Sequence, residues 1–333
     1  MRTVQRILAA SALPAAMLFM SGCSGSPHSP TENYILIAAN TKIPYWQSAA
    51  AGLSRAAAEM RVKSSVEGPD GYDPKGEHDA FQRAMAQKPS GILVSAADAS
   101  ILTPDIDGAV QQGVPVISID SDAPGSKRLF FVGTDNYNAG TLGGNLVAKL
   151  LNGKGNVVVF TIPAQQNLKD RLHGYQDAFV EHPGVKITDV VDMKGDPTVV
   201  FDTARKMIES KNKPDAFVCL EAVSCPEVGE VVNRENMNGK VTIVAMDTDQ
   251  RTIDWIQKGV INATIAQKPY TMAYYGTKLL DDLHHHPPKP LTGNWAEDAT
   301  APVPMFVDTG TFIVDKTNVA NFLQENKSPS TNQ

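Results

Sequence analysis

Short apolar runs alternate with longer stretches of helical periodicity along most of this chain. The runs are rich in β-branched residues and several end at Gly, Pro, Asp or Asn, a pattern typical of buried strands. In the first half of the chain they cover residues 34–39, 62–67, 91–96 and 114–119. In the second half they cover residues 156–162, 185–192, 216–221, 241–247 and 263–267.

The stretches between these runs have the spacing of amphipathic helices. They lie at about 45–60, 77–87 and 101–112, and then near 167–181, 199–211, 226–236, 249–258 and 270–283. Strands separated by single helices form βαβ units, which build parallel sheets covered on both faces. Because the pattern runs twice, it predicts an α/β protein with two similar lobes. Two later apolar patches, 303–307 and 311–314, follow a Pro-rich segment and are expected to cross between the lobes again.

The segment 116–136 is expected to join the two lobes. It begins with the apolar run that ends at Ile119, and Asp120 and Asp122 follow directly. In open α/β sheets, ligands bind outside the carboxyl ends of the strands. We therefore expect this segment to close the first lobe, supply a ligand carboxylate and continue through Thr134 and Asp135 into the second lobe.

Residues 1–22 have the pattern of a secretory signal peptide, with two arginines, an apolar core too short to span a bilayer, and a small-residue end. The sequence Met20-Ser21-Gly22-Cys23 resembles a bacterial lipobox, in which the cysteine becomes the lipidated first residue of the mature chain. Ordinary cleavage nearby, with Cys23 free, is the alternative. Residues 23–32 are polar and indicate a flexible tether. The sequence thus predicts an exported protein, in the periplasm or at the cell surface, whose one membrane contact is a lipid anchor.

Composition narrows the choice of function. About 310 residues remain after processing, which suits two domains. The net charge is −6 and no basic run occurs, so nucleic acid is not an expected partner. Cys219 and Cys225 could form a disulfide in an oxidising compartment or remain two separate buried thiols.

Polar and aromatic side chains gather where the predicted strands end. Two adjacent aromatics that open a helix can give a flat apolar wall with hydrogen-bonding tips, while carboxylates, amides and amines can bind hydroxyl groups. We expect these strand-end residues to meet at one cleft and bind the ligand: Tyr45, Trp46, Asp120, Ser121, Asn167, Lys169, Glu221, Asp247 and Gln267.

Other chemistries find little support in the sequence. It contains no phosphate-binding loop, no H-E-x-x-H, no G-x-S-x-G and no C-x-x-C. The glycines of 140–144 lack dinucleotide-fingerprint spacing and predict close helix packing. His284–His286 could bind a metal, but beside two prolines they are expected to be a solvated helix end. We therefore expect no enzyme activity, no cofactor and no metal.

Several motifs together resemble those of a known family. They are N-x-x-x-PYW, VPVISIDSDAP, VGTDNYNAG, NLKDRLHGYQDAF, VTIVAMD and INATIAQKPY. From about Asn33 to Lys316 the chain resembles the type I periplasmic sugar-binding proteins, closest to the ribose-binding group. The resemblance implies two Rossmann-like lobes joined by three crossovers, with a ligand clamped between them. It divides the chain into a first lobe of 33–134 plus about 268–302 and a second of 135–267 plus about 303–325.

The resemblance also suggests a role for each strand-end residue. Tyr45 and Trp46 stand where the family has ring-stacking aromatics, Asp120 and Asp247 at its two hydroxyl-binding aspartates, Lys169 at a site arginine, Gln267 at the hinge-proximal glutamine and Glu221 near a site asparagine. Ser121 stands where an arginine often follows the first aspartate, and Ile43 and Met246 also depart from the ribose pattern. These differences predict fewer planar donors than in a ribose site, because a lysine is a point charge where an arginine is a fork.

The expected function is therefore that of a monomeric solute-binding lipoprotein that binds a monosaccharide or polyol and delivers it to the permease and ATPase subunits of an ABC importer. The alternative is a sensory receptor of the same fold that signals occupancy by a sugar or signalling molecule to a chemoreceptor or sensor kinase. A sugar-responsive repressor is excluded, because the signal peptide stands where its helix-turn-helix would be.

Overall fold

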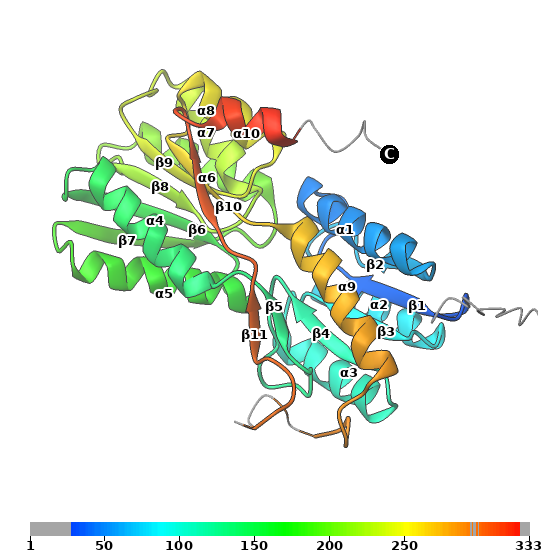
Figure 1. Ribbon diagram of the computed structural model, residues 1–333. Coiled ribbons are helices and arrows are strands. Elements are labelled where there is room, and N and C mark those ends of the chain that lie inside the picture. Colours follow the sequence, from blue (N-terminus) through cyan, green and yellow to red (C-terminus); the bar gives the residue numbers. More distant parts are fainter. Residues whose placement is uncertain (1–27, 294, 296–297, 299, 327–333) are drawn as a thin grey trace, which may run out of the picture.

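The computed structural model describes residues 28–293, 295, 298 and 300–326, and within them the chain forms two α/β lobes (Figure 1). The predicted signal peptide and Cys23 lie outside the described residues. Each lobe contains a six-stranded sheet, with the order β11-β5-β4-β3-β1-β2 in the first and β12-β10-β9-β8-β6-β7 in the second. No helix among the described residues is long and apolar enough to cross a membrane.

The first sheet is parallel throughout. Its strands are β1 (Asn33–Ile37), β2 (Lys63–Glu67), β3 (Gly91–Val94), β4 (Val116–Ile119), β5 (Phe131–Gly133) and β11 (Phe306–Asp308). Four helices cover it: α1 (Pro44–Met60), α2 (Pro74–Ala86), α3 (Ala99–Gln111) and α9 (Pro269–His285).

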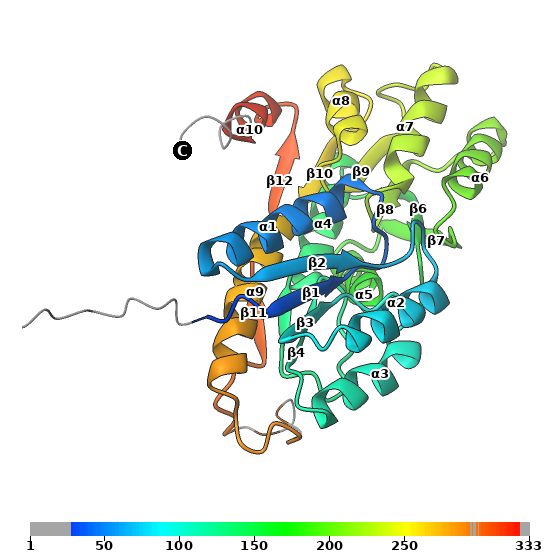
Figure 2. The same ribbon diagram turned by 90° about the vertical axis from the view of Figure 1, so that its right-hand side faces the viewer.

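The strands of this sheet bury both faces because alternate side chains point to opposite sides. Tyr34 and Leu36 of β1 pack in the core beneath α1 and α9, while Ile35 and Ile37 pack in a separate core beneath α2 and α3. Figure 2 shows α2 and α3 together on one side of this sheet, and α1 and α9 beyond it. This explains the uninterrupted apolar runs in the sequence.

The second sheet repeats the arrangement with one difference. Its strands are β6 (Gly155–Thr161), β7 (Val185–Asp192), β8 (Ala216–Cys219), β9 (Thr242–Met246), β10 (Ala263–Ala266) and β12 (Phe312–Asp315). Strand β12 runs antiparallel to β10, whereas the other neighbours are parallel. The helices are α4 (Asn136–Leu150), α5 (Gln166–Val180), α6 (Pro197–Glu209), α7 (Ser224–Arg234), α8 (Gln250–Lys258) and α10 (Val319–Asn326).

The helix starts follow local signals in the sequence. Proline occupies the first turn of four helices, where its missing N–H costs nothing, and an aspartate caps five by accepting hydrogen bonds from N–H groups at the start of the helix. The prolines are Pro44, Pro74, Pro197 and Pro269, and the caps are Asp73, Asp98, Asp135, Asp196 and Asp249.

The predicted close packing at the glycines of 140–144 is confirmed. A Cβ atom on Gly140 would lie 2.1 Å from the backbone oxygen of Arg171, and one on Gly174 would lie 2.2 Å from that of Tyr137. Helices α4 and α5 therefore touch backbone to backbone, and this contact fixes the height of Arg171 on α5.

The chain crosses between the lobes three times: between β5 and α4, between β10 and α9, and between β11 and β12. The expected division placed the third crossing near residue 303, which is too early. Strand β11 pairs in parallel with β5, with Phe306 opposite Phe131, so residues 306–308 extend the first sheet. The crossing follows Asp308, because the Phe306 ring stacks on that of Phe131 in the first lobe.

Candidate functional site

A cavity lies between the lobes at the carboxyl ends of both sheets. It has an empty volume of about 590 Å³ including the part open to solvent, within the usual size range of small-molecule sites. Segments after β1, β4, β6, β8, β9 and β10 contribute to its wall, so both lobes are needed to form it.

Two aspartates occupy equivalent positions in the two lobes. Asp120 directly follows β4 and Asp247 directly follows β9. Each of these strands is the fourth in its sheet, counted from the edge strand β2 in the first lobe and from the edge strand β7 in the second. Both aspartates have left-handed backbone conformations, with φ of 61° and 68°. Asp and Asn enter this region more readily than most residues. The turn directs each carboxylate into the cavity, where both residues are 6% exposed.

Arg171 is the cation of the cavity and was missing from the predicted set. It is 2% exposed, and its guanidinium donates to Asn136 Oδ1 at 2.9 Å, to the Leu220 backbone oxygen at 2.6 Å and to Gln267 Oε1 at 2.7 Å. Gln267 Nε2 in turn donates to Asp247 Oδ1 at 2.8 Å. A hydrogen-bonded chain thus links the guanidinium to the second aspartate.

Lys169, which was expected at this place, is exposed and does not line the cavity. The reason is helical geometry. Asn167 and Arg171 are four residues apart on α5 and share the face that meets the cavity, whereas residues two apart do not share a face. The planar donor expected to be lost at Lys169 is therefore present, because Arg171 supplies the fork, while Ser121 still stands where the ribose pattern has a second arginine.

The aromatic pair at the start of α1 forms a wall of the cavity. Tyr45 donates its hydroxyl to Asp120 Oδ1 at 2.6 Å, and the Trp46 ring lies edge-to-face against it with centroids 5.2 Å apart. Asp120 Oδ2 also accepts from Ser95 Oγ at 3.1 Å and from Asn167 Nδ2 at 3.4 Å. The last of these bonds crosses from the second lobe to the first.

A second contact also joins the lobes at the cavity. Gly195 of the second lobe lies so near Tyr72 of the first that a Cβ on the glycine would come within 2.3 Å of the tyrosine Cβ. Both residues line the cavity. Together with the bond between Asn167 and Asp120, this contact shows that the two lobes meet around the cavity in this conformation.

Glu221 is held by a short covalent loop. A disulfide joins Cys219 and Cys225, which settles the open alternatives in favour of pairing, and Glu221 lies inside the loop that it closes. Glu221 Oε2 accepts from the Val223 N–H at 2.6 Å, and Oε1 accepts from the backbone N–H and the hydroxyl of Ser224. Both carboxylate oxygens are thus engaged at the start of α7, while the residue still lines the cavity.

Burial dominates the electrostatics of these carboxylates. It raises the pKa of Asp120, Asp247 and Glu221, and that of Asp247 rises to about 7. The charge of Arg171 opposes each increase without cancelling it. Three carboxyl groups thus face one guanidinium, an arrangement suited to accepting hydrogen bonds from several hydroxyl groups.

The structure brings together seven of the nine predicted ligand-binding residues at the cavity wall: Tyr45, Trp46, Asp120, Asn167, Glu221, Asp247 and Gln267. Ser121 is absent from the wall, because the turn at Asp120 directs it into the first lobe, where it is fully buried. Asp122 also turns away from the cavity to pair with Arg128, whose Nη2 lies 2.6 Å from Oδ2.

Sequence reasoning missed several wall residues besides Arg171. Asn40, Tyr72 and Gln165 all line the cavity and follow β1, β2 and β6. The strand-end argument could have found each of them, since they occupy the same edge of the sheets as the predicted set.

Comparison with known proteins agrees with this geometry. The sequence profile of the periplasmic binding protein domain matches residues 34–285. The D-allose-binding periplasmic protein of Escherichia coli is 21% identical over 259 residues, which cover 75% of this chain and 83% of that protein.

Solved structures give the same result. A sugar-binding protein of a sugar ABC transporter from Bacillus halodurans is 34% identical, with a TM-score of 0.76 over 87% of this chain and 99% of that one. An arabinose-binding protein from Geobacillus stearothermophilus is 32% identical, with a TM-score of 0.73 over the same shares. The chain therefore belongs to the type I periplasmic sugar-binding proteins, the non-enzymatic solute-binding components of sugar ABC transporters.

Proposed function

We propose that this protein is an extracytoplasmic lipoprotein that binds one monosaccharide or polyol in the interlobe cavity and closes on it for delivery to an ABC permease. The observation that carries the proposal is the pair of buried aspartates, Asp120 and Asp247, that enter one cavity from equivalent turns in opposite lobes. A ligand with hydroxyl groups at both ends would contact both lobes at once. It would favour the closed form by its greater affinity for it.

The chemistry of the wall favours a small neutral polyhydroxylated ligand. Carboxylates accept hydrogen bonds from hydroxyls, Arg171 donates to hydroxyl or ring oxygens, and the Trp46 ring offers an apolar face. A ligand that leaves one of these buried groups unpaired would lose about 1–3 kcal/mol. That penalty supplies discrimination between sugars that differ at a single hydroxyl.

Aldopentoses are the first ligands to test. The arabinose-binding protein mentioned above covers nearly this whole chain in structure, and a relative from Bacillus subtilis that is 22% identical is named a ribose import binding protein. We propose import as the role for this chain because of its similarity to these two proteins. The anchor would be Cys23.

The test is a thermal-shift screen, followed by calorimetry, of the soluble chain from Ser26 against pentoses, hexoses, polyols and amino acids. A ligand at a hundredfold excess over its dissociation constant adds about 2.7 kcal/mol to the unfolding free energy. We expect one sugar or polyol to raise the melting temperature clearly. A response to amino acids alone would overturn the substrate class.

Matched variants connect the response to the cavity. We expect Arg171→Gln to weaken binding at least tenfold, since it removes a charge-assisted donor worth about 1.5–3 kcal/mol. Lys169→Gln, two residues away on the exposed face of α5, should leave binding unchanged. Asp120→Asn tests the first lobe without disturbing its backbone, because Asn also tolerates the left-handed turn. Full affinity in both Arg171→Gln and Asp120→Asn would mean that the ligand binds elsewhere.

A further inference from the structure

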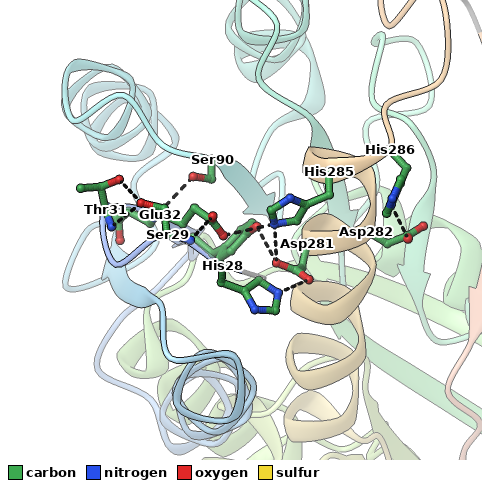
Figure 3. Close-up of polar contacts among 11 residues, drawn as sticks. His28, Ser29, Thr31, Glu32, Ser90, Asp281, Asp282, His285 and His286 are labelled. Carbon is green, nitrogen blue, oxygen red and sulfur yellow. Dashed lines mark hydrogen bonds and ion pairs between the residues drawn. The ribbon is translucent and has the colours of Figure 1, made fainter. Parts of the chain in front are cut away.

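Four potential metal ligands meet where the start of the described chain packs against the end of α9 (Figure 3). His28 and Glu32 come from the segment before β1, while Asp281 and His285 are four residues apart on α9 and so share one face. Helix α9 has 17 residues, so its far end lies about 25 Å from the end near the cavity. The cluster is thus separate from the sugar site.

The distances within the cluster match those between ligands of a small cation. His28 Nε2 lies 2.9 Å from Asp281 Oδ2, and His285 Nε2 lies 3.6 Å from Asp281 Oδ1 and 3.3 Å from Glu32 Oε2. The ligand atoms of the two histidines and Asp281 all lie within 4.8 Å of one another. In a tetrahedral site with bonds of 2.0–2.1 Å, neighbouring ligand atoms are about 3.3 Å apart. Small side-chain movements would bring these atoms around one ion.

Glu32 supplies a second observation, because one of its buried oxygens has His285 at ion-pair distance but no hydrogen bond. The residue is 7% exposed, and its Oε2 atom has no hydrogen bond to any residue that the structure describes. Oε1 accepts from the Ser29 N–H at 2.6 Å, which fixes the carboxylate with Oε2 directed toward His285 (Figure 3). Buried carboxylate oxygens normally have a partner, and a cation would provide one.

The surroundings also support ligation. Tyr34 donates its hydroxyl to Asp281 Oδ1 at 2.9 Å, the kind of outer contact that orients a carboxylate ligand. Two carboxylates and two neutral imidazoles would leave a bound divalent cation with no net charge. Imidazole nitrogen favours zinc-like transition metals over Mg²⁺ and Ca²⁺, which prefer oxygen ligands alone.

We propose that His28, Glu32, Asp281 and His285 form a binding site for a divalent transition-metal cation such as Zn²⁺, which fastens the beginning of the folded chain to α9. His284–His286 were expected to be a solvated helix end, which fits His286 but not His285. The His285 side chain is 30% exposed and turns toward Glu32 and Asp281, whereas that of His286 is 78% exposed and contacts Asp282. Since His28 stands five residues after Cys23, the ion would hold the first lobe close to the point where the tether begins.

The test is a calorimetric titration of Zn²⁺ into the untagged mature chain, freed of metal by chelation, at pH 7.5. We expect one ion per chain with a dissociation constant in the micromolar range or below, and Co²⁺ should give the visible absorption of a tetrahedral site. Millimolar Mg²⁺ should not compete. No binding with up to 100 μM Zn²⁺ would refute the proposal.

Variants separate this site from adventitious binding at the neighbouring histidines. His28→Ala and His285→Ala should each weaken Zn²⁺ binding at least tenfold, and His286→Ala, the matched control one residue along, should not. Loss of binding in His286→Ala but not in His28→Ala would assign the ion to the helix end and overturn the site. His28 precedes the first strand, so its replacement tests the proposal even if His285→Ala does not fold. Sugar affinity should be the same in all three variants, which distinguishes failure here from failure of the proposed function.

Discussion

Asp247→Asn should make the ligand-free protein more stable, and increasingly so as the pH rises. Burial raises the pKa of Asp247 from its ordinary value of 3.8 to about 7 in the folded protein. Between these two values the folded state binds more protons than the unfolded state, so stability falls as pH increases through this window. Below pH 3.8 the carboxyl is protonated in both states and contributes no penalty, whereas above pH 7 the full cost of a buried charge is present.

The size of this effect follows from the two pKa values. They differ by about 3, and each pKa unit corresponds to about 1.4 kcal/mol, so ionised Asp247 costs about 4 kcal/mol of unfolding free energy at pH 8. Asparagine removes the charge and keeps the shape, the left-handed turn and an oxygen that can accept from Gln267. The variant and wild type should therefore be equally stable near pH 4 and differ by up to about 4 kcal/mol at pH 8.

Urea unfolding of the ligand-free protein at several pH values between 4.5 and 8.5 measures this difference. Asp189→Asn is the control, since Asp189 lies exposed on the edge strand β7, and it should show no such trend. A constant difference between Asp247→Asn and wild type, or a variant that is less stable at pH 8, would refute the reasoning. Ligand binding should weaken in the same variant, because the buried carboxylate that destabilises the empty protein is the group that accepts hydrogen bonds from the ligand. Such an exchange of stability for function is common at binding sites.

Two further predictions concern the cysteines. Replacing Cys219 and Cys225 by alanine removes a disulfide between cysteines six positions apart and should lower the unfolding free energy by about 2 kcal/mol. Wild type treated with dithiothreitol should match the variant in urea unfolding. An unchanged urea midpoint in the variant would contradict this. Replacing Cys23 by serine in cells should move the protein from the membrane fraction to the soluble exported fraction, as followed by fractionation and blotting. Continued membrane association would exclude Cys23 as the anchor.

The sequence was most informative where strands end. Uninterrupted β-branched runs predicted both sheets, because a parallel sheet buried on two faces needs apolar residues at every position. The rule that ligands meet the carboxyl ends of strands placed Asp120, Asp247 and Gln267 correctly at the cavity wall. These residues immediately follow their strands, so no intervening loop could change where they point.

Prediction was weaker where the position of a residue depends on the rotation of a helix or on pairing with a segment far away in the sequence. Lys169 was chosen in place of Arg171, an error of two residues. Which of the two faces the cavity depends on the rotation of α5 about its axis, and that rotation is set by the backbone contact with α4 at Gly140 and Gly174. The site of the third crossing depends on a pairing between β11 and β5, which lie more than 170 residues apart. The glycines of 140–144 predicted close packing but not which helix would pack there, and the pairing of β11 with β5 leaves no local signal in the sequence.

The placement of α9 has a consequence for the order in which the lobes can be completed during synthesis. This helix covers one face of the first sheet, where the position of a Cβ on Gly276 would be 3.0 Å from Leu93 Cδ2 and 3.6 Å from Ile119 Cγ2. Yet α9 follows all five parallel strands of the second sheet in the chain. Until residue 285 has been made, α1 covers only part of that apolar face of the first lobe, and incompletely covered apolar surfaces are the ones that aggregate or recruit chaperones. The first lobe, although its strands β1–β5 are made first, can therefore be completed only after the five parallel strands of the second sheet have been synthesised.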